Sequence, residues 1–264
     1  MTSRGSAIAN YAPFIGLRYS FSRKRNRFTS VIAMVSMLGM VLGVASLITV
    51  LAVMNGFAGE LRGRILSLVA HGYIVSVDGG MAQWQQLSLQ VEASPAVVAA
   101  SPYITDKVIF SSGRTLRGGV LTAIEPQREN RVSGLSEAMR SGSLTSLEGE
   151  GFNVVLGVAL ARILGVGPGD QVEVVVPRLT VTPLGVFPRS KRLTVSGLFE
   201  IGAQPDAYQA YVSLATGQKL LGQREQVDGL RVKTRDLFSA PDTMAQLDEA
   251  LTGPYTVKDW SQTQ

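Results

Sequence analysis

The sequence contains no cysteine and only one histidine among its 264 residues. The lack of cysteine excludes disulfide bonds, a thiol nucleophile and a cysteine-ligated structural zinc ion. His71 alone could support histidine-based chemistry, but it follows a long apolar run, where a polar residue beside a membrane surface is ordinary. A catalytic role is therefore the less favoured interpretation of His71.

The motifs that mark common enzyme sites are missing as well. The sequence has no Gly-x-Ser-x-Gly, no His-Glu-x-x-His and no dinucleotide-binding fingerprint. The glycines of residues 164–170 (LGVGPGD) follow an expected helix and precede an expected strand, which is the reverse of the order in a phosphate-binding loop. We interpret them as a tight turn, and we predict no catalytic residue, no metal site and no cofactor held by this chain.

Acidic residues are missing before Glu60, whereas basic residues are frequent there. This basic segment accounts for the whole net charge of +5, because the remainder has 19 basic against 20 acidic residues. A basic excess beside an apolar run indicates membrane topology and contact with anionic headgroups, and it disfavours nucleic-acid binding. The basic residues are Arg4, Arg18, Arg23, Lys24, Arg25 and Arg27.

Residues 28–59 form an apolar run without charge that predicts a transmembrane helix. About 20 apolar residues suffice to cross a bilayer, so the run can span it with some tilt. The positive-inside rule then keeps residues 1–27 in the cytoplasm and exports the chain after Gly59. A cleaved signal peptide has an apolar core of only about 7–15 residues, and a buried core helix seldom runs so long without charge. A simple membrane anchor remains the alternative.

A stripe of small residues in this run favours a helix that packs against other helices. Small side chains three or four positions apart let transmembrane backbones approach closely. The stripe consists of Ser36, Gly39, Gly43 and Ser46. Before the run, the spacing of apolar residues over 11–27 predicts a short amphipathic helix in the inner headgroup layer, with an unstructured basic collar as the alternative.

After the apolar run, the pattern predicts a helical stalk over residues 60–72 and then an α+β domain. Two segments, residues 73–126 and 209–264, each have a strand–helix–strand pattern. Together they predict one membrane-proximal subdomain, and residues 127–208 predict a second subdomain inserted between them. We expect helices over 82–93, 158–164, 213–221 and 240–251. We expect strands over 73–78, 96–100, 104–111, 115–124, 153–156, 171–176, 193–199, 210–212, 227–232 and 255–260.

Residues 177–192 combine three prolines with an unusual number of apolar side chains. Pro177, Pro183 and Pro188 argue against a central strand or a helix interior. Residues such as Leu184 and Phe187 are more apolar than a solvated loop normally carries. We predict a stiff, protruding loop that binds a partner, with a loop folded back on its own domain as the alternative.

Four segments together resemble a known family: FIGLRYSFSRKRNRF, SMLGMVLGVASLITVLAVMNGF, ELRGRILSLVAHG and LGVGPGDQVEVVVP. They are similar to the transmembrane subunits of lipoprotein-releasing ABC transporters, the LolC/LolE family within the MacB-like permease superfamily. The resemblance implies a transmembrane helix with a stalk, followed by a periplasmic α+β domain of two subdomains. Further transmembrane helices are expected beyond this chain.

The resemblance also implies a place and a set of partners. We expect a subunit of the inner membrane of a Gram-negative bacterium, with its N-terminus in the cytoplasm and no bond chemistry of its own. Its partners would be a second permease subunit, identical or homologous, and the cytoplasmic ATPase LolD, which would bind ATP and Mg. The periplasmic carrier LolA and triacylated lipoproteins complete the set. By analogy, the candidates for acyl-chain contact are Met40, Leu47, Val50, Met54 and Phe57.

The Thr-Pro-x-Gly-x-x-Pro sequence at 182–188 resembles the carrier-binding hook of the LolC type. The resemblance carries over to Pro177, Val181, Thr182, Pro183, Leu184, Gly185, Pro188, Lys191 and Arg192. One departure is Glu173, which stands where a basic residue is expected. Because His71-Gly72 and the segment SPYITDKV look like the LolE type, a fused type that serves both roles as a homodimer is possible. The sequence is also compatible with a macrolide-efflux or cell-division permease, a membrane-anchored sensor or an anchored hydrolase.

Overall fold

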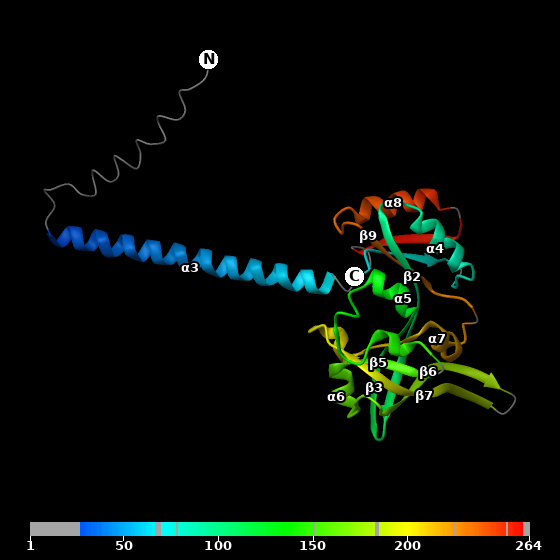
Figure 1. The fold of residues 1–264 in the computed structure, drawn as a ribbon. Helices are drawn as coiled ribbons and strands as arrows, with labels where there is room; N and C mark the ends of the chain where they lie inside the picture. Colours follow the sequence, from blue (N-terminus) through cyan, green and yellow to red (C-terminus); the bar gives the residue numbers. More distant parts are fainter. Residues whose placement is uncertain are drawn as a thin grey trace, which may run out of the picture. The chain divides into compact units, whose positions relative to one another are not determined.

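The computed structural model describes residues 27–66, 70–77, 79–149, 151–182, 185–223, 225–251 and 253–260. The chain divides between Glu60 and Leu61 into two compact units. The first unit holds most of a single long helix, α3 (Arg27–Leu66), and the second is an α+β domain (Figure 1). Residues 11–26 of the amphipathic helix expected over 11–27 lie outside the described residues.

Helix α3 has the character of a membrane-crossing helix. Its segment Ser30–Gly56 is long and apolar enough to cross a bilayer, and none of the window that defines it is buried. The helix continues beyond Gly59 to Leu66, so the first part of the expected stalk is helical. The prediction of one N-terminal apolar helix followed by an α+β domain is confirmed.

The second unit is built on one ten-stranded sheet in the order β10-β1-β9-β2-β3-β8-β5-β7-β4, with β6 paired to β2 and β7. Most neighbours are antiparallel, while β3–β8 and β5–β7 are parallel. The strands are β1 (Gly72–Ser76), β2 (Val97–Ser112), β3 (Thr115–Ile124), β4 (Met139–Ser141), β5 (Asn153–Gly157), β6 (Gln171–Thr182), β7 (Gly185–Phe199), β8 (Gln209–Ser213), β9 (Gly229–Thr234) and β10 (Tyr255–Asp259).

Short helices cover the sheet, and their ends follow the local sequence. In α7, the Ser213 hydroxyl oxygen accepts a hydrogen bond from the Thr216 N–H at 3.2 Å, and Gly222 ends the helix with a φ of 75°, as expected for a serine N-cap and a glycine C-cap. The helices of the domain are α4 (Trp84–Glu92), α5 (Pro126–Val132), η1 (Leu144–Leu147), α6 (Val158–Leu164), η2 (Gln204–Ala207), α7 (Leu214–Leu221) and α8 (Ala240–Ala250).

One main apolar core includes residues from strands far apart in the sheet. Ile74 of β1 and Leu230 of β9 are fully buried in it, as are Val174 of β6 and Leu193 of β7. The segments assigned to the membrane-proximal subdomain supply β10, β1, β9, β2, β3 and β8, and the inserted segment supplies β5, β7, β4 and β6. The two sets are successive regions of one sheet, and the division into two subdomains stays a prediction.

The expected strands over 96–100 and 104–111 are wrong as separate elements, because β2 is a single strand of 16 residues. It passes through Pro102, which lies in the gap between the two expected strands. Pairing with β3 begins at Tyr103, so β2 has only β9 as a strand neighbour at Pro102. Proline is tolerated where a strand has an open side, and β2 therefore continues.

Candidate functional site

The segment expected to be a protruding loop is instead a β-ribbon. Strands β6 and β7 pair in antiparallel fashion from Gln171↔Thr194 to Thr182↔Gly185. The prediction of a loop over 177–192 is therefore wrong, because strands occupy it on both sides of the connection. Figure 1 shows the paired strands projecting away from the rest of the domain.

The prolines fit this ribbon because of where they lie. The register shifts between Val176 and Leu179, so Pro177 sits in an irregularity of β6, and Pro188 pairs with Leu179 just beyond it. Strand β2 pairs with β6 only as far as Val175. Beyond that point the ribbon has open edges, and prolines in sheets are found on edge strands and at bulges. The sequence argument excluded a central strand and overlooked a two-stranded ribbon.

The described residues of the predicted hook lie on these two strands. The side chains of Pro177, Pro188, Lys191 and Arg192 are exposed. Val181, Thr182 and Gly185 are described only as strand backbone. Pro183 and Leu184, expected at the tip, lie outside the described residues. The assignment of all these residues to carrier binding stays a prediction.

The register separates Lys191 from Arg192. Val174 pairs with Lys191 and Glu173 pairs with Arg192. Because successive residues of a strand point to opposite faces, Lys191 and Arg192 belong to opposite faces of the ribbon. The single basic patch implied by the resemblance is thus divided, and Arg192 shares its face with the acidic Glu173.

On α3, the two sets of predicted residues fall on one side of the helix. At 100° per residue, the positions of the acyl-contact set and of the small-residue stripe overlap around the helix axis. Met40, Leu47, Val50 and Met54 are all more than half exposed. A Cβ added at Gly39 or Gly43 would meet no other atom within 4 Å. The side chain of Phe57 lies outside the described residues.

His71 connects the first strand of the domain to its neighbours. Its Nδ1 accepts a hydrogen bond from the Thr234 N–H at 3.2 Å and lies 2.8 Å from the Thr234 hydroxyl oxygen. The Trp260 N–H donates to the His71 carbonyl oxygen at 3.3 Å. Burial and the nearby Lys233 lower the pKa of His71. These contacts give His71 a structural role, in which the neutral ring ties β1 to β9.

We expect His71 to make the stability of the domain depend on pH. Its pKa is lower in the folded state than in the unfolded chain, so the unfolded state binds more protons as the pH falls. The contribution is complete above the unfolded pKa of about 6.5 and is lost as the pH falls from that value through the lower pKa of the folded state. Chemical unfolding of wild type and His71→Gln between pH 8 and pH 5 measures the effect. The difference between the two proteins should shrink toward acid pH, and a constant difference would contradict this assignment.

A polar network that the sequence did not suggest joins α5 to the sheet. Glu129, whose side chain is fully buried, accepts hydrogen bonds from Arg231 at 2.8 Å and from the Ser101 hydroxyl at 3.0 Å. Burial alone would lower the pKa of Arg231, but Glu129 raises it above its usual value, which keeps the guanidinium charged. The three residues come from α5, β9 and β2, so the pair fixes the position of a helix on two strands.

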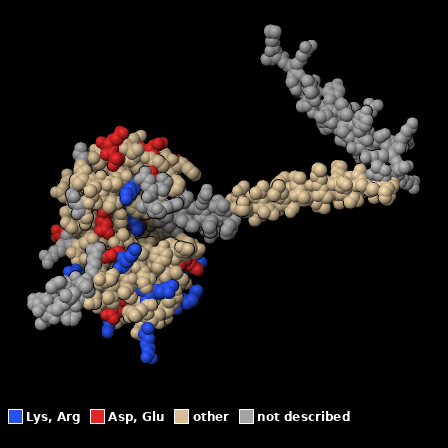
Figure 2. Space-filling model, turned by 180° about the vertical axis from the view of Figure 1, so that it is seen from behind, with Lys and Arg blue, Asp and Glu red and all other residues tan. Residues whose placement is uncertain are grey.

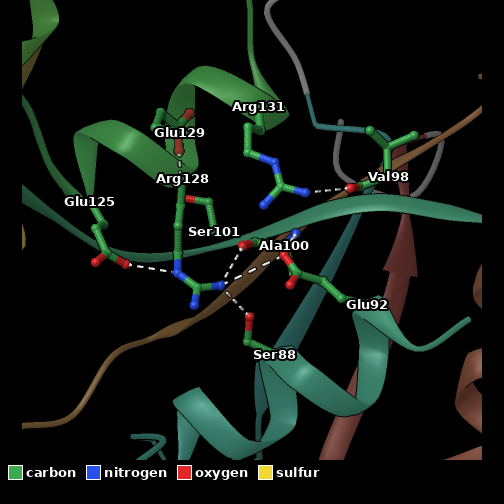
Figure 3. A network of polar contacts seen from close by, with 9 residues as sticks. All are labelled: Ser88, Glu92, Val98, Ala100, Ser101, Glu125, Arg128, Glu129 and Arg131. Carbon is green, nitrogen blue, oxygen red and sulfur yellow. Dashed lines mark hydrogen bonds and ion pairs between the residues drawn. The ribbon is translucent and has the colours of Figure 1, made fainter.

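Arg128 extends this network to α4 (Figure 3). Its guanidinium forms an ion pair with Glu125 at 3.1 Å and donates to the Ser88 hydroxyl at 2.8 Å. Glu92 lies 3.7 Å away and also accepts a hydrogen bond from the Ala100 N–H. These contacts of Arg128 join α5 to α4 and β2. Among the described residues, no three His, Asp or Glu side chains are grouped closely enough to hold a metal ion.

Charge is distributed unevenly over the domain. Figure 2 shows that acidic side chains gather at the end that holds α8, whereas Lys and Arg prevail at the opposite end. Helix α8 contributes exposed Asp242, Asp248 and Glu249. The β6–β7 ribbon projects near the end away from α8 (Figure 1). On the face that Figure 2 shows, the end of the domain away from α8 therefore carries more basic than acidic side chains.

Comparison with known proteins places this geometry in a family. A family model described as the MacB-like periplasmic core domain matches residues 33–250. LolC of Xylella fastidiosa is 40% identical over 248 residues, and LolC of Neisseria meningitidis is 37% identical over 250 residues. Each match covers 94% of this chain and 60% of the relative. LolE of Haemophilus influenzae is 30% identical over 232 residues, which are 86% of this chain and 56% of that protein.

These relatives are described as transmembrane proteins of lipoprotein-releasing systems. The resemblance to the LolC/LolE family that the sequence motifs suggested is thereby confirmed. The chain spans about three-fifths of the length of the curated relatives it matches.

Proposed function

The chain belongs to the family of MacB-like periplasmic core domains, and from that premise we propose that it is part of a permease subunit of an ATP-driven complex. The complex extracts lipoproteins from the inner membrane and passes them to a soluble periplasmic carrier. The observation that carries the proposal is the projecting β6–β7 ribbon in a chain 40% identical to a LolC protein. A ribbon with open edges and an apolar connection provides a rigid arm for capturing a partner.

In this proposal the chain does no bond chemistry. A separate cytoplasmic ATPase, LolD, binds ATP and Mg, and a second permease subunit completes the membrane part. The basic N-terminal segment stays in the cytoplasm, and α3 crosses the membrane. The exposed side of α3 that carries Met40, Leu47, Val50 and Met54 contacts the acyl chains of triacylated lipoproteins. Flexible methionine side chains suit chains of variable shape. The ribbon then receives the carrier, LolA, on the periplasmic side.

Photo-crosslinking from position 184 tests this function. A photoreactive residue in place of Leu184, in the connection between β6 and β7, should capture a soluble carrier in intact cells. Leu184→Asp should abolish the transfer of lipoprotein to the carrier, because an apolar contact would be replaced by a charge. We expect the variant to fold normally, since a change at the end of a hairpin costs less than about 0.5 kcal/mol.

The matched control is a probe at Leu116, which is 68% exposed near the end of the β2–β3 hairpin. Capture of the carrier from position 184 but not from position 116 supports the proposal. If the probe at position 184 captures only lipoprotein, or if Leu184→Asp still transfers lipoprotein to the carrier at the normal rate, the ribbon has another role.

A further inference from the structure

Phe238 has the most exposed large apolar side chain of the domain among the residues that the structure describes, at 84%. It lies in the connection between β9 and α8, residues 235–239, which we name the Phe238 loop. A single exposed apolar residue is ordinary on a protein surface. The significance of Phe238 therefore depends on how it is held, where it lies in the domain and which charges surround it.

Hydrogen bonds on both sides of the domain edge hold the Phe238 loop in place. The Thr234 hydroxyl donates to the Asp236 carbonyl oxygen at 2.7 Å. The Trp260 indole N–H donates to the Leu237 carbonyl oxygen at 3.3 Å. A loop that is ordered before it binds loses little conformational entropy on binding, so the Phe238 ring is displayed ready for contact.

The loop lies at the edge of the sheet where the chain enters the domain. Helix α3 ends at Leu66, and β1 begins at Gly72. His71, directly before β1, accepts a hydrogen bond from the Trp260 N–H through its carbonyl oxygen and contacts Thr234, the last residue before the loop. The Phe238 loop is therefore joined to the start of β1, a few residues along the chain from the membrane-crossing helix.

Basic side chains prevail around the loop. Lys233 and Arg235 lie at its β9 end, and Lys258 lies near the end of β10. The Arg131 guanidinium donates to the Val98 carbonyl oxygen at 3.1 Å, near the start of β2 (Figure 3). That part of the chain adjoins the loop, because the Arg235 N–H donates to the carbonyl oxygen of the residue two positions before Val98.

The acidic side chains near the loop offset only part of this charge. They are the exposed Asp236 and Asp242 and the buried Asp259. Asp248 and Glu249, which belong to the acidic end of the domain, lie roughly 12–14 Å along α8 from its first residue. The surface around Phe238 is therefore basic on balance.

An exposed aromatic ring with basic neighbours suits the surface of a membrane that contains anionic lipid. Aromatic rings are enriched at the level of the headgroups, and Lys and Arg are attracted to anionic headgroups. The other partner within reach of this edge is the stalk of a second permease subunit. If that subunit is a copy of this chain, its stalk carries Arg62 and Arg64 against Glu60, and its charge would repel the loop.

We propose that the Phe238 loop inserts Phe238 into the headgroup layer of the periplasmic leaflet, where Arg235 and Lys258 contact anionic phospholipid. This inference rests on the part of the proposed function that places α3 across the membrane, and it is independent of the carrier and of the ribbon. The apolar segment of α3 has 27 residues, more than a span requires, so tilt can lower the start of the domain toward the headgroups. The loop would give the domain a second attachment to the membrane.

A fluorescent dye at position 238 tests the inference. Because the chain lacks cysteine, Phe238→Cys gives the full chain a single site for nitrobenzoxadiazole. In vesicles of phosphatidylethanolamine and phosphatidylglycerol, the emission should shift to shorter wavelength, and lipids with a spin label near the headgroup should quench it. Leu116→Cys, at a position 68% exposed near the end of the β2–β3 hairpin, is the matched control and should show neither effect. Equal quenching at the two positions overturns the inference.

Reversal of the basic charges tests the attraction to anionic lipid. Arg235→Glu/Lys258→Glu in the labelled chain should reduce the quenching at position 238 to less than about half, because basic residues near an anionic surface attract it. Both side chains are exposed, so the fold should be retained, which circular dichroism checks. Arg114→Glu/Arg117→Glu makes the same charge change at the β2–β3 hairpin and should leave the quenching unchanged. Equal quenching in the two double variants would contradict the contact with anionic lipid.

A photoreactive residue at position 238 in intact cells identifies what the loop meets in the assembled complex. Capture of phospholipid, identified by mass, supports the inference, whereas capture of the second permease subunit or of lipoprotein instead overturns it. Alkaline extraction separates this result from the proposed function. If the chain is extracted, its proposed place in the membrane fails. If the chain resists extraction and position 238 meets no lipid, only the inference fails, and capture of the carrier from position 184 still stands.

Discussion

Replacing Glu129 with glutamine is expected to lower the free energy of unfolding of the domain by about 3–5 kcal/mol. The Glu129 side chain is fully buried, and its ion-pair partner Arg231 is 14% exposed. Removing the negative charge leaves the guanidinium buried without a counter-charge, and this costs more than the pair itself contributes. Urea unfolding of the full chain, followed by tryptophan fluorescence, measures the change, because both tryptophans, Trp84 and Trp260, lie in the domain.

Two further variants separate the charge effect from a general loss of contacts. In Glu129→Leu/Arg231→Met both charges are replaced by apolar groups, so most of the stability should return. Arg140→Gln removes an exposed ion pair with Glu200, whose side chains are 67% and 38% exposed, and should cost less than about 1 kcal/mol. A cost for Glu129→Gln no larger than that of Arg140→Gln would show that the buried pair is unimportant.

Replacing Val44 with lysine is expected to impair insertion of α3 into the membrane. Val44 lies near the middle of the apolar segment Ser30–Gly56. A lysine at the centre of a transmembrane helix costs about 2.5–3.5 kcal/mol on insertion scales. The fraction of full-length chain that resists alkaline extraction from membranes should therefore fall clearly below that of wild type.

Val31→Lys is the matched control for position along the helix. A lysine near the end of a span can extend its ammonium group to the headgroup layer, so the cost there is small. Equal extraction of the two variants would indicate that α3 is not embedded as a spanning helix.

Much of the fold could be predicted from local signals. The expected bounds of β3 and α6 match the structure. The connection between β2 and β3 falls in the gap between the expected strands 104–111 and 115–124. Helix α7 begins and ends where Ser213 and Gly222 indicated. Each of these features depends on residues that are close in sequence, such as caps, turns and alternation.

The features that were missed depend on residues far apart in the sequence. Strand β9 lies between β1 and β2, and no pattern within β9 predicts those neighbours. The Glu129–Arg231 pair joins residues 102 positions apart, and the segment around Glu129 had suggested only a subdomain boundary. The separation of Lys191 from Arg192 depends on the register of β6 and β7. The prolines of this segment had led to the prediction of a loop, for which no register exists.

The candidate site was predicted in part. Family motifs led to the ribbon and to the apolar side of α3, where the expected residues lie. They did not lead to the contact of Lys191 and Lys219 with the Phe152 ring, because Phe152 and Lys219 come from other elements and belong to no motif. Only the packing of α7 beside β7 brings the three side chains together.

The open edges of the ribbon also bear on how copies of the protein behave when they are crowded. Unpaired strand edges are templates for a further strand, and a long exposed ribbon could in principle nucleate polymers. Pro177 and Pro188 interrupt the row of N–H donors just where the ribbon leaves the sheet, and the register irregularity at Pro177 disturbs the regular spacing of the edge. The prolines therefore let the protein display a projecting ribbon while they discourage aggregation through its edges.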